Sequence, residues 1–491
     1  MTSLIKNKAI QSIMNATDKV KNLGQIYTPN NIVCDMLNIA NYNGVEILQK
    51  HIMDNSCGNG AFLVEIVARY ICAYKQKHNQ IVNLKTELET YIHGIEIDKA
   101  EYQQCIDNLN NIILASGVDS NKNSIKWDIV CGDTLLISQY NHQMDFVVGN
   151  PPYVRIHNLQ DNFNKVRKYQ FAQNGMTDLY IVFYEIGLKM LNDSGKLVYI
   201  TPNSFYSSVA GQGFRDYILH SQQLVSIVDL GHYQPFNATT YTTICFFDKS
   251  QQLSQFDYSI YDNGKIKFCE RPNLSNAFNN GKMILATQQS RDMLKSIQNY
   301  IPQNKNKILV KNAFATLADS IFIQKEFDFI SPYIIDICKA STSEYKKCIY
   351  PYDSKGQLIP FEKLDKSLQN YLNQNKTSLS NRSLDKRTEW YAYGRSQAIS
   401  DVPKPKIAIN TTIKNINSIK INSINPNCGV YSGLYIVIDT NTDISTNTIK
   451  TILMTQEFIQ YIATIGKCKS GGYFTFSSND LKQYLLYKLQ I

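Results

Sequence analysis

The sequence predicts an α/β fold with a largely parallel sheet in its first half, followed by a separate α+β domain. Short apolar runs of strand length alternate with amphipathic helical segments up to residue 250. Beyond Ile308 this alternation gives way to short strands, turns rich in Asn and Ser, and scattered helices. Residues 331–491 carry 20 Lys and Arg against 12 Asp and Glu, which is +8 of the chain's net +9. This indicates a nearly neutral body joined to a basic module for a polyanion, although a solvated basic surface is the plainer alternative.

Length and composition set further bounds. A chain of 491 residues is long enough for two or three domains with sizeable cores. No run approaches the ~20 apolar residues of a membrane span, and the N-terminus lacks the apolar core of a signal peptide. The 11 cysteines form no Cys-x-x-Cys pair and have no His at zinc spacing, so we expect reduced thiols and no metal site. These features predict a cytoplasmic protein without membrane contact.

The order of the elements predicts four segments. They are an N-terminal helix (1–20), the α/β domain (21–250), edge strands with a connector (251–303) and the basic domain (304–491). Apolar runs predict further strands of the α/β domain at 91–98, 125–130, 196–201, 224–230 and 241–248. Apolar residues at helical spacing predict helices that begin at Pro29 with Thr28 as N-cap, after Gly60, after Asp178 and near Gly213.

The stretch 145–153 organises the α/β domain. Residues 146–148 are typical of a buried parallel strand, and two prolines then prevent a helix or strand from continuing. Asn150 is left at the carboxyl end of the strand, where open α/β sheets bind ligands. Its amide oxygen and the Pro151 carbonyl are acceptors that suit an amine conjugated to a heteroaromatic ring, and Tyr153 offers a face for stacking. An isolated motif of this kind is more often a simple strand end with a packed Tyr, so the neighbouring motifs decide its meaning.

A glycine-containing turn follows the first strand of the domain. Asp54 ends that strand, while Gly58 and Gly60 allow the backbone to approach a ligand closely. The turn is not the dinucleotide fingerprint, because the third glycine of that motif would fall at Leu63. The acid before the turn favours a ligand with a cationic or amine group over a pyrophosphate.

Two more acids close the next two strands. Glu96 ends the strand at 91–98 and is placed for ribose hydroxyls, whereas Asp133 follows the strand at 125–130 and suits an adenine amine. Each acid alone is more often a helix cap, but acids at three successive strand ends are far less expected by chance. The gap between the glycine turn and Glu96 exceeds the usual ~20 residues, so the intervening helix must be long or doubled.

Residues 387–395 of the basic domain interleave aromatic and basic side chains, and two lysines follow. This pattern suits phosphates and exposed bases, but a surface loop anchored by a buried Trp explains it equally well. Under the first interpretation the DNA-contacting side chains are Arg387, Trp390, Tyr391, Arg395, Lys404 and Lys406.

The ordered set of motifs resembles the gamma-group amino-methyltransferases of bacterial DNA modification, the TaqI-like adenine-N6 enzymes. The segments that carry the resemblance are 24–29, 54–62, 94–98, 132–135, 150–153, 177–191 and 230–247. The last third is similar to the target-recognition domain of that family at 317–322, 390–395, 405–407 and 471–473. The resemblance implies a Rossmann-like S-adenosylmethionine-dependent methyltransferase domain followed by a domain that recognises the DNA target.

The resemblance also implies how the cofactor S-adenosylmethionine is held. Tyr27, Thr28 and Pro29 would wrap its methionine end, together with Asp54 and the turn formed by Cys57, Gly58 and Gly60. Glu96 would bind the ribose and Asp133 the adenine amine, with Leu135 near the adenine ring. Phe62, Ile97, Thr134 and Asn150 complete the implied cofactor site.

For the target, the resemblance implies an adenine flipped out of duplex DNA. The implied catalytic set is Asn150, Pro151, Pro152, Tyr153 and Phe236. Asn150 and the Pro151 carbonyl would accept hydrogen bonds from N6, while Tyr153 would stack on one face of the base. Phe236 matches the second stacking aromatic, and Tyr233 in the same loop is the rival for that role.

One residue departs from the family pattern, because family members often have Pro where this chain has Asn55. The change should alter the turn without removing a ligand. The chain has no room for a fused nuclease beside both modules, so we expect a stand-alone methyltransferase acting on double-stranded DNA in the bacterial cytoplasm. Its partner is either a separately encoded restriction endonuclease or, if the enzyme is an orphan, none.

Three other functions compete with this interpretation. Cytosine-N4 methylation fits the same pair of acceptors. Methyltransferases of protein glutamine amides share the Asn-Pro-Pro-Tyr motif, but they are short and carry their extra domain before the catalytic one. A DNA-binding protein with an inactive methyltransferase fold is the third, and the intact Asp54, Glu96, Asp133 and Asn150 argue against it.

Overall fold

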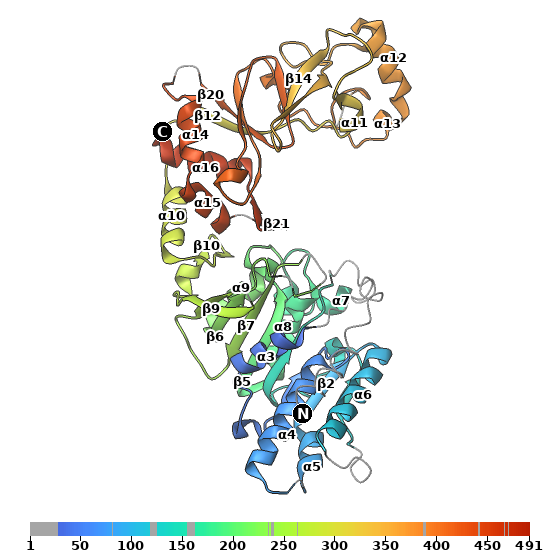
Figure 1. Ribbon diagram of the computed structural model, residues 1–491, viewed down its shortest axis with the longest axis vertical. Helices are drawn as coiled ribbons and strands as arrows, with labels where there is room; N and C mark the ends of the chain where they lie inside the picture. Colours follow the sequence, from blue (N-terminus) through green and yellow to red (C-terminus); the bar gives the residue numbers. More distant parts are fainter. Residues whose placement is uncertain are drawn as a thin grey trace. The chain divides into compact units, whose positions relative to one another are not determined.

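The computed structural model describes residues 28–80, 82–117, 125–154, 163–233, 235–236, 240–262, 264–385, 389–439, 442–465, 467–469 and 471–491. The chain divides into two compact units, Met1–Thr287 (unit 1) and Gln288–Ile491 (unit 2), which we describe separately (Figure 1). The helix predicted over 1–20 lies outside the described residues.

Unit 1 is built on a nine-stranded sheet in the order β3-β2-β1-β4-β5-β7-β6-β8-β9. The strands are β1 (Ile52–Asp54), β2 (Ile92–Glu96), β3 (Asp128–Cys131), β4 (Met144–Gly149), β5 (Leu191–Pro202), β6 (Leu224–Asp229), β7 (Thr242–Asp248), β8 (Asp257–Asp262) and β9 (Lys265–Glu270). β1 to β5 pair in parallel, whereas β7 is antiparallel to both neighbours and β9 is antiparallel to β8. The predicted α/β fold, with its parallel sheet and antiparallel close, is confirmed.

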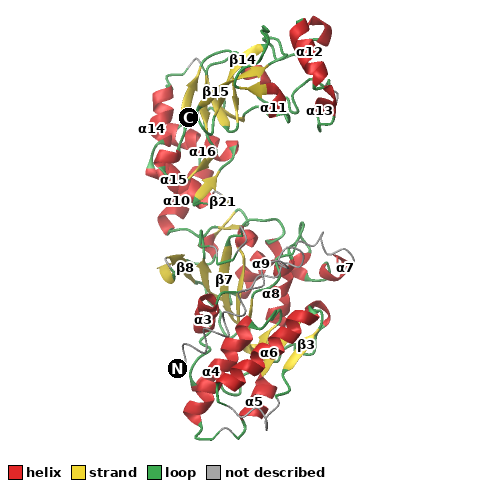
Figure 2. Cartoon of the chain, turned by 45° about the vertical axis from the view of Figure 1, so that its right-hand side comes forward, coloured by secondary structure: helices red, strands yellow, loops and turns green. Residues whose placement is uncertain are grey.

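Helices cover the sheet on both faces (Figure 2). They are α3 (Asn30–Ile39), α4 (Ala61–Lys77), α5 (Leu84–Tyr91), α6 (Lys99–Ala115), α7 (Phe163–Val166), α8 (Leu179–Met190) and α9 (Gln212–Ser221). The long gap before Glu96 contains two helices, α4 and α5, as predicted. The predicted N-cap is wrong: α3 begins at Asn30, Pro29 precedes it, and no side chain caps it.

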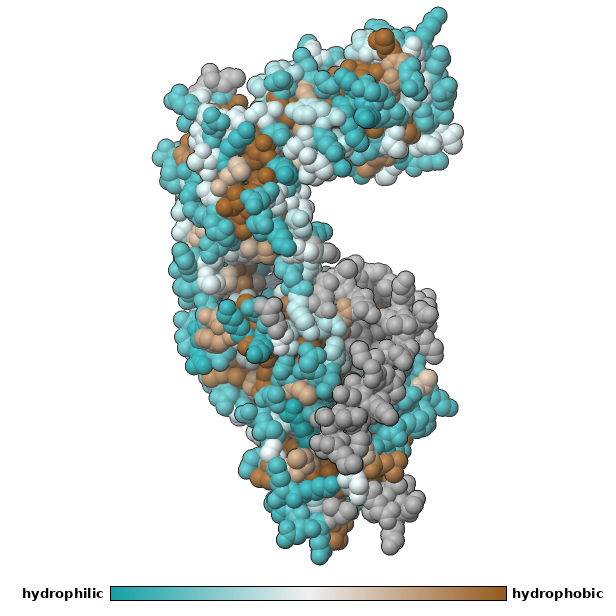
Figure 3. Space-filling view, viewed as in Figure 1, coloured by the Kyte–Doolittle hydropathy of each residue, from teal (hydrophilic) through white to brown (hydrophobic). Residues whose placement is uncertain are grey.

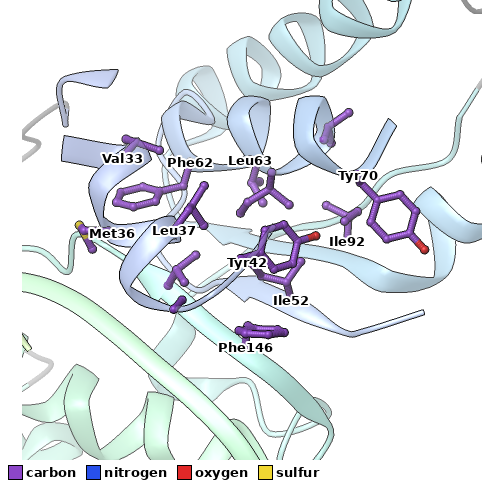
Figure 4. Close-up of a cluster of buried hydrophobic side chains, with 14 of the residues drawn as sticks. Val33, Met36, Leu37, Tyr42, Ile52, Phe62, Leu63, Tyr70, Ile92 and Phe146 are labelled. Atoms are coloured by element: carbon purple, nitrogen blue, oxygen red, sulfur yellow. The ribbon is translucent and has the colours of Figure 1, made fainter. Parts of the chain in front are cut away.

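Successive side chains of a strand point to opposite faces of the sheet, so the apolar residues of unit 1 are divided between two cores. Ile52 and Phe146 face the core formed with α3, α4 and α6, which Figure 4 shows. Met53 and Val147, the next residues along the same strands, face the core formed with α8 and α9. The central strands are therefore buried on both faces, which fixes their register and the place where each one ends.

Among its described residues, unit 2 contains three small sheets together with several helices. One sheet has the order β12-β20-β16-β18, the second β13-β15-β14-β19 and the third β17-β22-β21. The strands are β12 (Ile308–Asn312), β13 (Ile323–Gln324), β14 (Ile334–Lys339), β15 (Glu344–Ile349), β16 (Lys406–Ile409), β17 (Thr412–Ile413), β18 (Ile421–Ile424), β19 (Cys428–Tyr431), β20 (Leu434–Ile438), β21 (Lys467–Lys469) and β22 (Tyr473–Thr475). The helices are α10 (Gln288–Asn299), α11 (Asp319–Phe322), α12 (Lys366–Gln374), α13 (Lys376–Ser380), α14 (Thr446–Leu453), α15 (Gln456–Ile465) and α16 (Ser478–Leu489).

The division between the units lies between Thr287 and Gln288. The stretch predicted as edge strands and connector, 251–303, contributes β8 and β9 to the large sheet of unit 1 and α10 to unit 2. Within the described part of the chain, no helix combines the length and apolar character needed to cross a membrane.

Candidate functional site

The carboxyl ends of β1 and β4 meet at a tight contact. A Cβ atom on Gly149, the last residue of β4, would lie 2.8 Å from Oδ1 of Asp54, the last residue of β1. Gly60 closes the turn after β1 with φ +89°, and a Cβ there would lie 2.8 Å from the Cys105 sulfur of α6. Glycine at these positions lets the turn and the two strand ends approach closely.

Asp54 is the most deeply buried acid of this edge, with 1% of its surface exposed. Its Oδ1 accepts a hydrogen bond from the Ser56 backbone N–H at 3.1 Å. Burial raises the pKa of the Asp54 carboxyl to about 8, and the nearby Glu96 adds to the effect. A buried acid of this kind favours a ligand that brings a positive charge.

Glu96 ties the next strand to the glycine turn. Its Oε2 accepts a hydrogen bond from the Gly58 N–H at 2.8 Å, and its Oε1 accepts one from the Asp98 N–H at 2.8 Å. Burial raises the pKa of the Glu96 carboxyl. Ile97, which follows, has 64% of its side chain exposed, an apolar surface beside the acid that suits the flat face of a ligand.

Asp133 completes the row of acids at the end of β3. Its Oδ1 accepts a hydrogen bond from the Leu135 N–H at 3.0 Å and so caps the short helix Thr134–Leu136. The Gly132 N–H donates to the Glu96 carbonyl at 2.9 Å. The acids therefore end three neighbouring strands in the order β3-β2-β1, as the sequence predicts.

Asn150 follows β4 beside these acids. Its Nδ2 donates to the Thr28 hydroxyl at 3.2 Å, and the Ser56 hydroxyl donates to the Asn150 carbonyl at 3.3 Å. The bond to Thr28 turns the amide so that Oδ1 points away from that hydroxyl. Thr28, whose predicted capping role is wrong, thus orients the amide at the centre of the site.

Two aromatic rings lie next to this amide. Tyr153 and Phe236 contact each other edge to face, with ring centroids 6.4 Å apart and planes at 79°. The Tyr153 hydroxyl donates to the Ile200 carbonyl at 3.3 Å. Tyr233 instead packs on Tyr261, with centroids 4.7 Å apart. The structure brings Phe236 rather than Tyr233 to Tyr153, and a base stacked between these two rings requires them to separate.

Of the residues predicted to hold the cofactor, one is not described and three use their side chains inside unit 1. Tyr27 is outside the described residues. The Phe62 ring packs in the hydrophobic core beside Val33 (Figure 4). The Thr134 hydroxyl is buried and donates to the Asn55 carbonyl at 2.7 Å, so it serves the fold. The Cys57 thiol is free and buried against the Cys105 thiol of α6, so it faces the interior of unit 1.

Asn55, the residue that departs from the family pattern, holds the turn after β1 in place through its side chain. It is fully buried, and its Oδ1 accepts a hydrogen bond from the Tyr199 hydroxyl on β5 at 2.8 Å. Its Nδ2 points to the Met190 sulfur at 3.8 Å. Asn55 therefore fixes the turn after β1 to β5 across β4, a role that the sequence did not reveal because Tyr199 lies 144 residues away.

The residues predicted to contact DNA in unit 2 are mostly used inside it. Tyr391 is buried and its hydroxyl donates to the Ile359 carbonyl at 2.7 Å. Trp390 packs on Phe361, with the Lys376 ammonium 5.2 Å from its ring centroid. Tyr391 is therefore too buried to offer its ring to DNA, whereas Trp390 is partly exposed and its predicted DNA contact stays a prediction.

The basic members of that set are engaged as well. Lys406 is 6% exposed, its ammonium donates to the Val402 and Cys428 carbonyls, and burial lowers its pKa to about 8. Lys404 pairs with the buried Asp401 at 2.8 Å.

Arg395, the remaining described basic residue of the set, donates to the Ser383 carbonyl at 2.7 Å and lies 3.5 Å from an Asp385 carboxylate oxygen. Arg387 is outside the described residues. Of the described basic residues, Lys406 is excluded from a DNA surface by burial, and Lys404 and Arg395 are half-exposed ion-pair partners.

Comparison with known proteins shows which families the chain is similar to. Residues 61–236 match the family described as Eco57I restriction-modification methylase. The restriction enzyme and methyltransferase RM.Eco57I of Escherichia coli is 25% identical over 481 residues, which cover 77% of this chain and 48% of that protein. The methyltransferase M.BstVI of Geobacillus stearothermophilus is 25% identical over 447 residues, 81% of this chain and 78% of that protein.

Residues 61–236 are therefore similar to restriction-modification methylases, which supports the resemblance to the gamma-class enzymes. Among solved structures, the type IIL restriction-modification enzyme MmeI in complex with DNA has the same fold, with a TM-score of 0.60 and 14% identity. The alignment covers 97% of this chain and 66% of that one. The chain thus spans about half of RM.Eco57I and two thirds of MmeI.

The cofactor of gamma-class methyltransferases is S-adenosylmethionine, and the donor set of this chain fits it. The buried Asp54 suits the cationic methionine end, and the open turn at Gly58, where a Cβ would meet no atom within 4 Å, leaves room above the backbone. Glu96 and Asp133 offer carboxylates to hydroxyl and amine groups, with Ile97 exposed beside them. A sulfonium-containing nucleoside matches this combination of charge and apolar surface.

The raised pKa of Asp54 predicts that the affinity of this chain for S-adenosylmethionine depends on pH. Below pH 8 the carboxyl of the ligand-free protein is largely protonated, so pairing with a cationic ligand must expel that proton. The dissociation constant for S-adenosylmethionine should fall about tenfold per unit between pH 5.5 and 7.5. Calorimetry across this range on the wild type and Asp54→Asn checks it: the variant should bind more weakly and lose this slope. Equal slopes in both proteins would remove Asp54 from the ligand's charged end.

The Asn55–Tyr199 hydrogen bond should contribute to the stability of unit 1, so substitutions of the two residues should have coupled effects on the free energy of unfolding. Tyr199→Phe leaves the buried Asn55 oxygen without this donor, so the free energy of unfolding should fall by about 1–3 kcal/mol. Trp127 fluorescence in a Trp390→Phe background follows the urea unfolding of unit 1 alone. In a double-mutant cycle with Asn55→Ala the two losses should be non-additive, whereas additive losses would show that the pair is not coupled.

Proposed function

We propose that this chain transfers a methyl group from S-adenosylmethionine to the N6 amine of adenine at a defined site in duplex DNA. The observation that carries the proposal is the Asn150 amide, held by Thr28 at the end of β4 beside the row of acids. The adjoining Tyr153 and Phe236 supply aromatic faces for a base taken out of the duplex.

The reaction needs a stronger nucleophile than an aromatic amine, because the lone pair of such a nitrogen is delocalised into the ring. Bound S-adenosylmethionine supplies an electrophilic methyl carbon on a sulfonium sulfur. Asn150 Oδ1 and the Pro151 carbonyl would accept hydrogen bonds from the two N6 hydrogens and localise the lone pair on nitrogen. Positive charge then grows on N6, so both acceptors bind the transition state more tightly than the ground state.

An aromatic amine is too weak an acid to lose its proton first, so the proton leaves to solvent after the methyl group has transferred. Asn150 therefore acts as an oriented dipole rather than as a base. Thr28 and Ser56 hold its side chain and its backbone, which keeps the acceptor in place without reorganisation during the reaction.

The basic charge of the second part of the chain supports DNA as the substrate over a protein glutamine. The relative RM.Eco57I is a restriction enzyme and methyltransferase, and the relative M.BstVI is a methyltransferase. We further propose that the chain works beside a restriction endonuclease that cuts the same unmethylated site. Cytosine-N4 remains the alternative acceptor, because its amine presents the same two hydrogens.

The identity of the methylated base is directly testable. DNA from cells that express the chain should contain N6-methyladenine at one sequence motif, and DNA from cells that express Asn150→Ala should lack it. Nucleoside mass spectrometry combined with base-resolved methylation mapping measures both. N4-methylcytosine at the motif would overturn adenine as the acceptor, and unmodified DNA would overturn the proposed activity.

Variants of Asn150 and Tyr153 should separate chemistry from base capture. Asn150→Ala should lower the single-turnover rate about 10²-fold or more, with little change in affinity for DNA or cofactor. Tyr153→Ala should weaken capture of the flipped base by about 1–3 kcal/mol, whereas Tyr153→Phe should retain most activity because the ring face matters. Single-turnover methylation of a duplex with the mapped site measures these rates. A wild-type rate in Asn150→Ala would refute its proposed role.

A further inference from the structure

Unit 2 has a surface concavity of about 500 Å³ that none of the functions described above uses. It is lined by Ser341, Asn410, Thr411, Thr412, Ser432, Gly433 and Tyr473. Because Lys406 and Tyr391 are buried inside unit 2, we looked for exposed polar groups elsewhere in this unit. In Figure 3 the visible face of unit 2 is largely teal and white, with brown apolar patches between the polar residues.

The concavity is built where all three sheets of unit 2 approach one another. Ser341 follows β14 and Ser432 follows β19 in one sheet, and Asn410 follows β16 in another. Thr412 and Tyr473 belong to the third sheet, where β17 pairs with β22. Residues more than 100 positions apart in the chain are thus brought to one place by strands rather than by a free loop.

A glycine permits the close approach of two of these sheets. A Cβ on Gly433 would lie 2.5 Å from the Ala340 Cβ and 2.6 Å from the Ile409 carbonyl oxygen. Asn410 supports the wall, since its Nδ2 donates to the Thr412 and Ser418 carbonyls and its Oδ1 accepts from the Lys420 N–H. The shape of the concavity is therefore fixed by packing and by satisfied hydrogen bonds.

The groups left at its surface are hydroxyls. Ser341, Thr412 and Ser432 are exposed, and the hydroxyls of the two serines lie 3.2 Å apart. Tyr473 is 38% exposed and adds an aromatic face with a hydroxyl. Hydroxyls both donate and accept hydrogen bonds, so they can contact phosphate oxygens and the edges of either base pair.

Two exposed lysines border the same place. The Lys414 side chain lies over Gly472, since its Cε would be 3.0 Å from a Cβ there. Lys469 is paired with Tyr473 in the β21–β22 ladder and is exposed. Among the described residues that line the concavity, none is acidic. Cations beside neutral hydroxyls suit DNA, because its phosphates are anionic and its base edges carry hydrogen-bond donors and acceptors.

We propose that this concavity binds duplex DNA, with Lys414 and Lys469 on phosphates and with Thr412, Ser432 and Tyr473 on base edges that select the site. The proposal rests on the proposed function, which makes duplex DNA the substrate. It assigns sequence selection to side chains that the basic and aromatic pattern of the sequence did not indicate.

The experiment measures binding of the full chain to a labelled duplex with the mapped site and to a scrambled duplex, by fluorescence anisotropy between 50 and 200 mM salt. Lys414→Gln with Lys469→Gln should weaken binding to both duplexes and lower the slope of log K against log salt by about 2. Thr412→Val and Tyr473→Ala should each lower the preference for the mapped site about tenfold and leave the slope unchanged.

Matched controls lie on the helices α12 and α13 of the same unit, where Lys366 and Thr377 are exposed. Lys366→Gln and Thr377→Val should bind both duplexes as the wild type does. Thermal melting followed by circular dichroism confirms that each variant is folded, and Tyr473→Phe, which keeps the ring, should retain part of the preference.

The experiment distinguishes failure of this DNA-binding concavity from failure of the proposed function. If the wild type prefers the mapped site and the folded concavity variants keep its affinity, slope and preference, this site is overturned and the proposed function stands. If the wild type binds neither duplex in a salt-dependent manner, duplex DNA as the substrate is overturned, and the site falls with it.

Discussion

The close approach of β1 and β4 at Asp54 and Gly149 is the constraint on which the candidate site depends. The space between the Asp54 carboxylate and the backbone of Gly149 admits no side chain. This contact places Asn150 immediately beside the row of acids, and the hydrogen bonds from Ser56 and to Thr28 then hold it there. A larger residue at Gly149 would move the amide away from the acids, because the sheet register fixes both strand ends.

This arrangement favours ligand binding at the expense of stability. The folded-state pKa of Asp54, about 8, lies above the ~3.9 of an unfolded chain, so the folded state binds the proton more tightly. The contribution of Asp54 to stability therefore decreases as pH rises from about 4 to 8. A cationic ligand reverses this by stabilising the carboxylate. Burial of Glu96 acts in the same direction, which is expected where a site is shaped for its ligand rather than for folding.

Local patterns predicted the strand ends of unit 1, but not the long-range contacts of either unit. Strand ends, glycine turns and acids follow one another closely in sequence, and parallel strands bring their carboxyl ends to one edge, so the places of Asp54, Glu96, Asp133 and Asn150 could be predicted. Burial in unit 2 depends on distant partners. Lys406 looks like a surface cation in the sequence, yet the carbonyls of Val402 and Cys428 enclose it. The bond from Tyr199 to Asn55 likewise leaves no local trace.

The chemistry and the proposed recognition place different demands on the two units. The acceptors for an amine must be held within a few tenths of an ångström, which β4 and its neighbours achieve because both faces of the sheet are packed. Groups that select a DNA sequence must instead be replaceable without disturbing that geometry. The hydroxyls of Thr412 and Ser432 meet this demand, because they are exposed while Gly433 and Asn410 fix the backbone beneath them. Substitutions at these two positions should therefore change the selected sequence while the rate of methyl transfer at a bound site is retained.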